Sequence, residues 1–222
     1  GISLAVFSYV KKGNDSHRVT IGGITMNFTE GERSINLPVA VPTSDEDGML
    51  FGLENNRPDP IICSNNISEG IQCYTDFTIS TNMRIDYNIS YEVTLEKDIE
   101  SELSESDVRI YLEKQDINGD YQEVFSPKAY TPIDSTNLNG TDELGASNSE
   151  MLLDTGTVSS STTYYYRLRI WLSSDYTFTQ ETKDFIGHIN VYGSNVEVNA
   201  STGISLTFEF LTPLSVIFSF VS

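Results

Sequence analysis

Basic residues are scarce in this chain of 222 residues. It has 13 Lys and Arg against 32 Asp and Glu, so its formal net charge is -19. Binding to nucleic acid, or to an anionic membrane by charge, needs clustered Lys and Arg, and this balance argues against both. Long apolar runs are also missing, because the longest, 210–222, includes Pro213 and is shorter than the roughly twenty residues of a membrane-spanning helix. We predict neither a nucleic-acid partner nor a membrane span.

Histidine is nearly absent, and this limits the chemistry available to the chain. His17 and His188 are the only histidines; strand alternation places His188 on an outward face, and His17 falls in a polar turn. The sequence contains no G-x-S-x-G, P-loop, G-x-G-x-x-G, H-E-x-x-H or C-x-x-C motif. A pair of carboxylates could serve glycosidic chemistry, but with 32 Asp and Glu in the chain the presence of such pairs says little about function. We therefore predict that the protein is not an enzyme, and we expect no cofactor apart from the calcium considered below.

Only two cysteines are present, Cys63 and Cys73, and they flank a short polar stretch. In an oxidising compartment a disulfide between them would close a small loop and add roughly 2–3 kcal/mol of stability. The alternative is a pair of unrelated thiols. We predict the disulfide, because the chain begins at Gly1 with an uncharged segment that fits the mature end left by a cleaved leader.

The dominant sequence period is two, which is the pattern of half-buried β-strands. Alternating runs lie near 18–29, 34–41, 72–80, 87–95, 108–112, 120–126, 150–158, 164–172 and 185–191. The clearest turn signal is Asn118-Gly119, a pair suited to a type I′ hairpin turn. The best helical stretch, 96–107, has few apolar positions and is interpreted as an acidic connection with at most one helical turn.

This pattern of many short strands indicates an all-β fold, an antiparallel β-sandwich of the jelly-roll or immunoglobulin-like kind. A hydrophobic fraction of 38% is enough for a sizeable core. We predict one sandwich domain over 13–200, because no linker or composition shift divides it. Residues 127–149 are polar and turn-rich and are predicted to form a long surface loop.

The two ends of the chain are too apolar to lie in water. Residues 1–10 (GISLAVFSYV) carry no charge and alternate as a strand that is apolar on both faces. The other end, 201–222, alternates in two runs that Pro213 separates. Each end must be buried in its own domain or in a neighbouring molecule, and the role of 201–222 is left open at this stage.

Two acidic segments have features of calcium loops. Asp116, Asn118 and Asp120 have the i, i+2, i+4 spacing that opens an EF-hand loop, but the glycine stands at 119 and the distal Glu is missing. The second segment, 45–47, places three acids before a glycine. The plainer interpretation is a hairpin turn for the first segment and a solvated acidic turn for the second. The alternative is calcium binding by Asp45, Asp47, Asp116 and Asp120.

Three stretches together resemble a known family. They are FSYVKKG and the sequence that follows it to 48, the pair YEVTLEK and VRIYLEK on either side of the acidic connection, and YYYRLRI with its continuation to 193. These stretches are similar to the secreted bacterial TasA/camelysin-like group of fibre-forming proteins. The resemblance implies a jelly-roll subunit of an extracellular, biofilm-matrix filament, with an N-terminal strand that inserts into the next subunit. Neither 201–222 nor the Cys63–Cys73 loop is expected of that group, and no zinc-binding helix supports the protease activity ascribed to some relatives.

Physical reasoning from the residues leads to the same assembly. A sandwich that lacks one strand leaves backbone N–H and C=O groups unpaired, and an extended segment of a neighbour can pair with them by β-augmentation. Head-to-tail insertion does not close on itself, so it grows filaments. In the predicted donor strand, 1–12, each buried side chain would contribute roughly 1.5–3 kcal/mol before entropy costs. The donor residues are Ile2, Leu4 and Val6 on one face, with Phe7 and Tyr9 on the other.

The sequence is therefore interpreted as a secreted filament subunit whose partner is another copy of itself. The rival interpretation is a monomeric extracellular binding module, an adhesin or carbohydrate-binding sandwich. In that case Tyr165 and Trp171, predicted to be exposed, would form the site with the 127–149 loop. The position of residues 1–10, inside their own sandwich or projecting from it, separates the two interpretations. The negative charge would oppose sideways aggregation, and divalent cations would relax that repulsion.

Overall fold

The computed structural model describes residues 16–21, 24–30, 35–37, 40–53, 72–83, 88–133, 146, 149–177, 183–196, 206–208 and 214–220. Strands account for most of the described chain, with one short α-helix and one 3₁₀ turn. In chain order the elements are β1 (Ser16–Ile21), β2 (Ile24–Glu30), β3 (Asn36–Leu37), α2 (Asp45–Gly48), β4 (Tyr74–Met83), β5 (Asn88–Lys97), η2 (Glu105–Asp107), β6 (Val108–Gln115), β7 (Tyr121–Ala129), β8 (Glu150–Val158), β9 (Thr162–Leu172), β10 (Lys183–Val196), β11 (Leu206–Phe208) and β12 (Leu214–Phe220).

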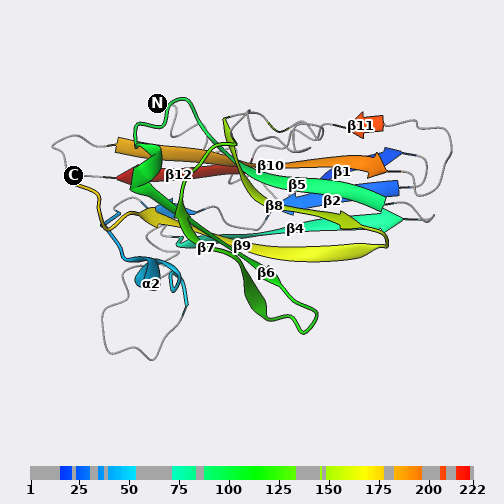
Figure 1. Ribbon diagram of the computed structural model, residues 1–222, viewed down its shortest axis with the longest axis horizontal. Coiled ribbons are helices and arrows are strands. Elements are labelled where there is room, and N and C mark those ends of the chain that lie inside the picture. Colours follow the sequence, from blue (N-terminus) through cyan, green and yellow to red (C-terminus); the bar gives the residue numbers. More distant parts are fainter. Residues whose placement is uncertain are drawn as a thin grey trace.

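The strands form two sheets that pack face to face (Figure 1). Sheet A has the order β1-β2-β4-β9-β6-β7, and sheet B has the order β3-β12-β10-β5-β8, with β11 beside β10. Paired neighbours are antiparallel, except that β3 and β12 run parallel. The predicted antiparallel β-sandwich is therefore confirmed.

The sequence period of two reappears as the pattern of burial. Along β9, Tyr166, Leu168 and Ile170 are fully buried between the sheets, while Tyr165 and Arg167 face outward. The same alternation in β5, β6 and β10 supplies Tyr91, Val93, Leu95, Val108, Ile110, Leu112, Phe185, Ile189 and Val191 to the core. Full burial of an apolar side chain of this size is worth roughly 1.5–3 kcal/mol. The sandwich is thus held together mainly by the inward faces of these strands.

The apolar C-terminal segment contains an inner strand of sheet B. β12 lies between β3 and β10, and its pairing with β10 runs from Lys183↔Phe220 to Ile189↔Leu214. β11 pairs with the other end of β10. Within 201–222, whose role the sequence left open, the described strands β11 and β12 therefore belong to sheet B of the same sandwich.

A tight hairpin joins β6 and β7 where Asn118-Gly119 predicted one, but the turn type differs from the prediction. The Gly119 N–H donates to the Asp116 carbonyl at 3.1 Å, so Ile117 and Asn118 are the central residues. Gly119 follows them with φ of 88°, a conformation that favours glycine. The predicted type I′ turn with Asn118 and Gly119 at its centre is wrong, because the hydrogen bond from Gly119 to Asp116 places the turn one residue earlier.

Several predicted element boundaries also change. His17 lies in β1 and not in a turn. The acidic stretch 96–107 contains a single 3₁₀ turn, η2, as expected. The predicted loop 127–149 begins three residues too early, since β7 continues to Ala129. Its Pro127 is tolerated because β7 is an edge strand among the described residues.

Candidate functional site

The sequence singled out a donor strand and a disulfide. The donor-strand residues lie outside the described part of the chain, and these are Ile2, Leu4, Val6, Phe7 and Tyr9. Cys63 also lies outside it, whereas Cys73 is fully buried directly before β4. The donor strand and the Cys63–Cys73 bond both remain predictions.

The acidic segment 45–47 attaches α2 to the outer face of sheet A. Arg109 of β6 donates through Nε to Asp45 Oδ1 at 2.9 Å and through Nη2 to Asp45 Oδ2. The same Nη2 donates to the Pro127 carbonyl at 2.7 Å. Asp47 accepts a hydrogen bond from the Ser44 hydroxyl at 2.7 Å. Asp45, a predicted calcium ligand, is therefore engaged in an ion pair that fixes the helix.

The acidic segment 116–120 organises the β6–β7 hairpin. The Asp116 carboxylate accepts from the backbone N–H of Asp120 at 3.0 Å and of Asn118 at 2.8 Å, and these bonds lower its pKa. Within the described residues, no three His, Cys, Asp or Glu side chains form a group that could hold a metal ion. Calcium binding at Asp45, Asp47, Asp116 and Asp120 gains no geometric support and remains a prediction.

The aromatic pair of the rival binding-module interpretation is split by the fold. Tyr165 is 47% exposed, as predicted, but Trp171 is only 1% exposed. Gly48 of α2 packs directly on the Trp171 indole. A Cβ at that position would be 2.2 Å from Trp171 Cε2. The prediction that Trp171 is exposed is wrong, because the 41–53 segment packs over the outward face of β9.

Of the two histidines, the structure describes the side chain of His188. His188 faces outward from β10 with its side chain 17% exposed, and its Nε2 lies 3.2 Å from Asp98 Oδ2. His188 is therefore less exposed than the sequence suggested, and it sits beside a carboxylate.

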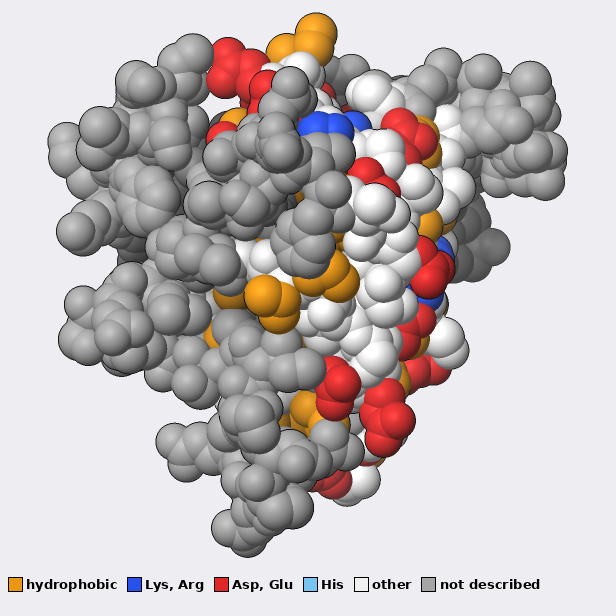
Figure 2. Space-filling model, turned by 90° about the vertical axis from the view of Figure 1, so that its left-hand side faces the viewer, with side chains coloured by type: hydrophobic (Ala, Val, Ile, Leu, Met, Phe, Trp, Pro, Cys, Tyr) orange, Lys and Arg blue, Asp and Glu red, His pale blue; other side chains and the backbone are white. Residues whose placement is uncertain are grey.

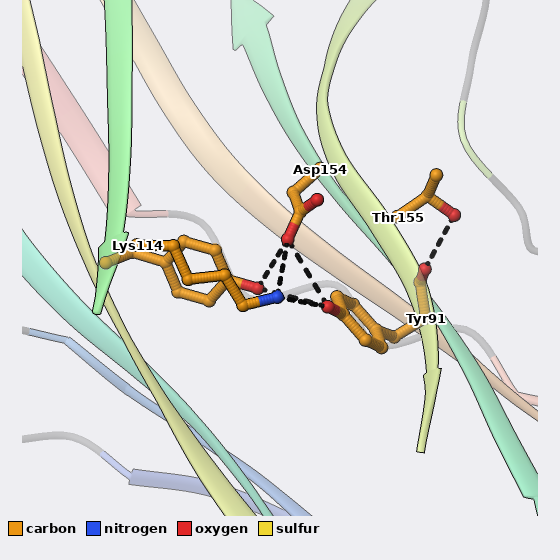
Figure 3. A network of polar contacts seen from close by, with 5 residues as sticks. Tyr91, Lys114, Asp154 and Thr155 are labelled. Atoms are coloured by element: carbon orange, nitrogen blue, oxygen red, sulfur yellow. Dashed lines mark hydrogen bonds and ion pairs between the residues drawn. The ribbon is translucent and has the colours of Figure 1, made fainter. Parts of the chain in front are cut away.

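A polar cluster that the sequence did not identify lies between the two sheets (Figure 3). Lys114 of β6, in sheet A, donates through Nζ to the Tyr91 hydroxyl at 2.8 Å and to Asp154 Oδ2 at 3.0 Å. Tyr91 belongs to β5 and Asp154 to β8, so both partners come from sheet B. Figure 3 shows the Lys114 amine pointing at these two groups. The cluster is a polar link between the sheets.

Tyrosines surround the Lys114–Asp154 pair. The hydroxyls of Tyr166 and Tyr91 donate to Asp154 Oδ2 at 2.7 and 3.3 Å. The Lys114 Nζ lies 4.0 Å from the ring centroid of Tyr164, within the range of cation–π attraction. The side chains of Lys114 and Asp154 are 25% and 14% exposed. The ion pair is therefore partly desolvated and closely packed by aromatic rings.

The environment of the cluster shifts its titrations. Burial raises the pKa of Tyr166 and of Tyr91, and the Asp154 charge raises both further. Burial alone would lower the pKa of Lys114, but its hydrogen bond to Tyr91 and the charge of Asp154 outweigh burial and raise that pKa above 10.5. At neutral pH both tyrosines therefore keep their hydroxyl protons.

The outer face of sheet A carries a second cluster of cation, carboxylate and tyrosines. Arg167 donates through Nε and Nη2 to the two oxygens of Asp76 at 2.7 and 3.0 Å. Its guanidinium lies 4.3 Å from the Tyr74 ring centroid and 4.2 Å from that of Tyr121. Both rings thus stack on the guanidinium.

Two strand edges lie on the same side of the sandwich. β7 ends sheet A and β8 ends sheet B, and no other described strand pairs with either outer edge. The two sheet ends face each other, because the Tyr130 hydroxyl, directly after β7, donates to the Leu95 carbonyl of β5 at 2.9 Å. The Ile133 N–H donates to the Glu150 carbonyl at 2.7 Å, at the first residue of β8. Edges of this kind can accept a further strand.

Among the charged side chains on the described part of the face in Figure 2, the acidic ones predominate. Figure 2 shows Asp and Glu side chains recurring over the described part of one face, with few Lys and Arg. Several of the basic side chains are held by acids, as in the pairs Arg109–Asp45, Arg167–Asp76 and Arg169–Glu113. None of the helices in the described part of the chain has the length and apolar character needed to cross a bilayer.

The sequence matches no protein-family model and no curated protein. Among solved structures, similarity is found to the alchivemycin A macrocyclization catalyst AvmM, at 10% identity and TM-score 0.29, over 95% of this chain and 97% of that chain. A collagen-binding domain of a Staphylococcus aureus adhesin shares 9% identity, with TM-score 0.23, over 68% and 89% of the two chains. The CooA pilin subunit of enterotoxigenic Escherichia coli shares 11% identity, with TM-score 0.20, over 66% and 76%. TM-scores this low carry no argument about the fold or function of this chain.

Proposed function

We propose that the protein is a secreted structural subunit that polymerises head to tail into an extracellular filament. Residues 1–10 of one copy would lie along an edge of the next sandwich as an added strand. The observation that carries the proposal is the pair of edges, β7 and β8, which face the same side and are unpaired by any described strand. The TasA/camelysin-like resemblance of the sequence favours the same assembly.

The chemistry of the donor segment suits such an edge. Residues 1–10 carry no charge, so they can approach the surface of a subunit with net charge -19 without repulsion. Their backbone would pair with the edge strand while alternate apolar side chains are buried, which gives ladder hydrogen bonds and apolar contact together. The charge of each subunit opposes sideways aggregation, and Ca²⁺ or high salt would relax that repulsion and let filaments bundle.

The first prediction tests this proposal with Leu4→Asp. The substitution would bury an unpaired carboxylate at every junction, at a cost of several kcal/mol, so the folded subunit should fail to polymerise. Leu4→Met keeps an apolar side chain of similar volume and should still form filaments. Negative-stain microscopy and sedimentation measure the outcome, and a synthetic peptide of residues 1–10 should cap growing wild-type ends.

Two results would contradict the proposal. Normal filaments from the Leu4→Asp protein would show that residues 1–10 are not the donor. A wild-type protein that stays monomeric in all conditions would favour the binding-module interpretation, for which the fold leaves Tyr165 but not Trp171 on the surface.

A further inference from the structure

We propose that Lys114 and Asp154 condense to an amide, a covalent cross-link between the two sheets of the sandwich. The Nζ of Lys114 lies 3.0 Å from Asp154 Oδ2, and the two residues belong to β6 of sheet A and β8 of sheet B. The proposal does not depend on filament assembly, because both groups belong to the same sandwich.

The site holds the two reacting groups in place and restricts water. β6 and β8 fix the two side chains from opposite sheets, so their reaction is intramolecular and gains from fixed proximity. The rings of Tyr91, Tyr164 and Tyr166 surround the lysine amine, with centroids 5.4, 4.0 and 5.1 Å from Nζ. A partly desolvated pair of charges is less stable than the same pair in water, whereas a neutral amide loses much less on burial.

The reaction balances without any other reagent. The pair starts as an ammonium and a carboxylate. One proton passes from Nζ to Oδ2 along their direct contact, which leaves a neutral amine and a carboxylic acid. The amine lone pair attacks the carboxyl carbon and forms the C–N bond, and a second proton moves from nitrogen to the departing oxygen. The C–O bond then breaks, one water leaves, and a neutral amide replaces the two charges.

The observed hydrogen bonds provide a route for both protons. Oδ2, the departing oxygen, accepts from Lys114, from the Tyr91 hydroxyl and from the Tyr166 hydroxyl. The Tyr91 hydroxyl also accepts from Lys114 at 2.8 Å, so it can take a proton from Nζ while it gives its own to Oδ2. Because burial keeps both tyrosines protonated, each has a proton to donate.

Lysine is the side chain that this chemistry requires. The other cation–carboxylate contacts described in the structure use Arg or His, in the pairs Arg109–Asp45, Arg167–Asp76, Arg169–Glu113 and His188–Asp98. A guanidinium stays protonated in proteins and is a poor nucleophile. The cluster between the sheets therefore combines an amine, a carboxylate and two proton-carrying hydroxyls.

The test is the mass of the intact denatured protein, produced in a host without N-glycosylation and reduced beforehand. The wild type should be lighter than its sequence by one water molecule. A tryptic digest should contain one branched peptide joining Lys114 to Asp154. The matched control is Lys114→Arg, which preserves a cation beside Asp154 but lacks the amine, and it should have its full mass. A second variant, Asp154→Ala, should also have its full mass.

Two outcomes would overturn the proposal. A wild type at its full sequence mass, with Lys114 cleaved normally by trypsin, would show that the contact is an ion pair only. Loss of water in Lys114→Arg as well would place the condensation elsewhere in the chain. The wild-type mass requires no folded variant, and neither measurement requires filaments, so each result is independent of the proposed function.

Discussion

The two faces of sheet A carry the same kinds of groups and arrange them differently. On the inner face, Lys114 reaches across to Asp154 on the other sheet among tyrosine rings. On the outer face, Arg167 pairs with Asp76 on the neighbouring strand of the same sheet, between Tyr74 and Tyr121. The two clusters occupy neighbouring positions of the β6–β9 ladder. Lys114 pairs with Tyr166 at the inner cluster, and Glu113 pairs with Arg167 at the outer one.

This difference follows from the side chains that each face can accommodate. The planar guanidinium of Arg167 makes two parallel bonds to Asp76 and stacks on flat rings, which suits an open sheet face. The narrow ammonium of Lys114 fits between two sheets and presents a single nitrogen that can form a bond. The outer cluster thus links neighbouring strands of one sheet, whereas the inner cluster links the two sheets.

The largest loss of stability is expected at Arg169, whose side chain is on the outer face of sheet A but is covered by other parts of the chain. Arg169 is 0% exposed; its Nε donates to the Phe51 carbonyl at 2.8 Å, and its Nη1 pairs with Glu113. Arg169→Ala leaves the carboxylate without its partner and should lower the free energy of unfolding by about 3–5 kcal/mol. Urea denaturation measures the change.

The matched control lies two residues earlier on the same strand and face. The side chains of Arg167 and Asp76 are 18% and 41% exposed, so Arg167→Ala should cost only about 1 kcal/mol, from a weak ion pair and ring stacking. Equal losses for the two arginines would show that burial does not distinguish them and would break the comparison.

The next largest loss of stability is expected in α2, the helix that covers part of this outer face. Gly48→Ala would place a methyl group 2.2 Å from Trp171 Cε2, so α2 must move away, at a cost of about 1–3 kcal/mol. Trp171 is the single tryptophan of the chain, so its fluorescence emission should shift towards that of a more solvated indole.

Gly119→Ala is the control for that substitution. It adds the same methyl where nothing lies within 4 Å, at a φ of 88°. The left-handed backbone should cost about 1–2 kcal/mol without changing Trp171 emission. If Gly48→Ala leaves both emission and stability unchanged, the close packing of α2 on sheet A is not maintained in solution.

The fold could largely be predicted from strand alternation. Tyr166, Leu168 and Ile170 alternate with Tyr165 and Arg167, and the structure buries the first set between the sheets. The burial of Trp171 could not be predicted this way, because its outward position is covered by a segment far away in the sequence. The pairing of β12 with β10 is likewise a long-range contact that local pattern does not specify.

The cluster between the sheets left only part of its signal in the sequence. Lys114 shares the parity of Val108, Ile110 and Leu112, so a lysine at an inward position was visible. Asp154 was hidden, because the β5–β8 ladder changes register and pairs Thr94 with Leu152 but Val93 with Asp154. The bulge turns Asp154 inward, and simple alternation from Met151 would turn it outward.

The smallest loss of stability is expected from removing a single hydroxyl, that of Tyr166, on the inner face of sheet A. In protein whose Lys114 and Asp154 have not condensed, Tyr166→Phe removes the hydrogen bond to Asp154 Oδ2 and should cost about 1–1.5 kcal/mol at neutral pH. Because the folded-state pKa of Tyr166 is raised above 10.0, its contribution is fully present below pH 10 and is lost as the pH rises further, where only the unfolded chain releases that proton. Urea denaturation of the wild type at successive pH values should therefore show stability falling above pH 10, and Tyr166→Phe should reduce that slope by up to about 1.4 kcal/mol per pH unit.

Tyr165→Phe is the control on the outer face, 47% exposed, and should change neutral-pH stability by less than about 0.5 kcal/mol. If the two variants behave alike, the hydroxyls on the two faces are equivalent, and the inner cluster is not the buried proton-holding site that the structure describes.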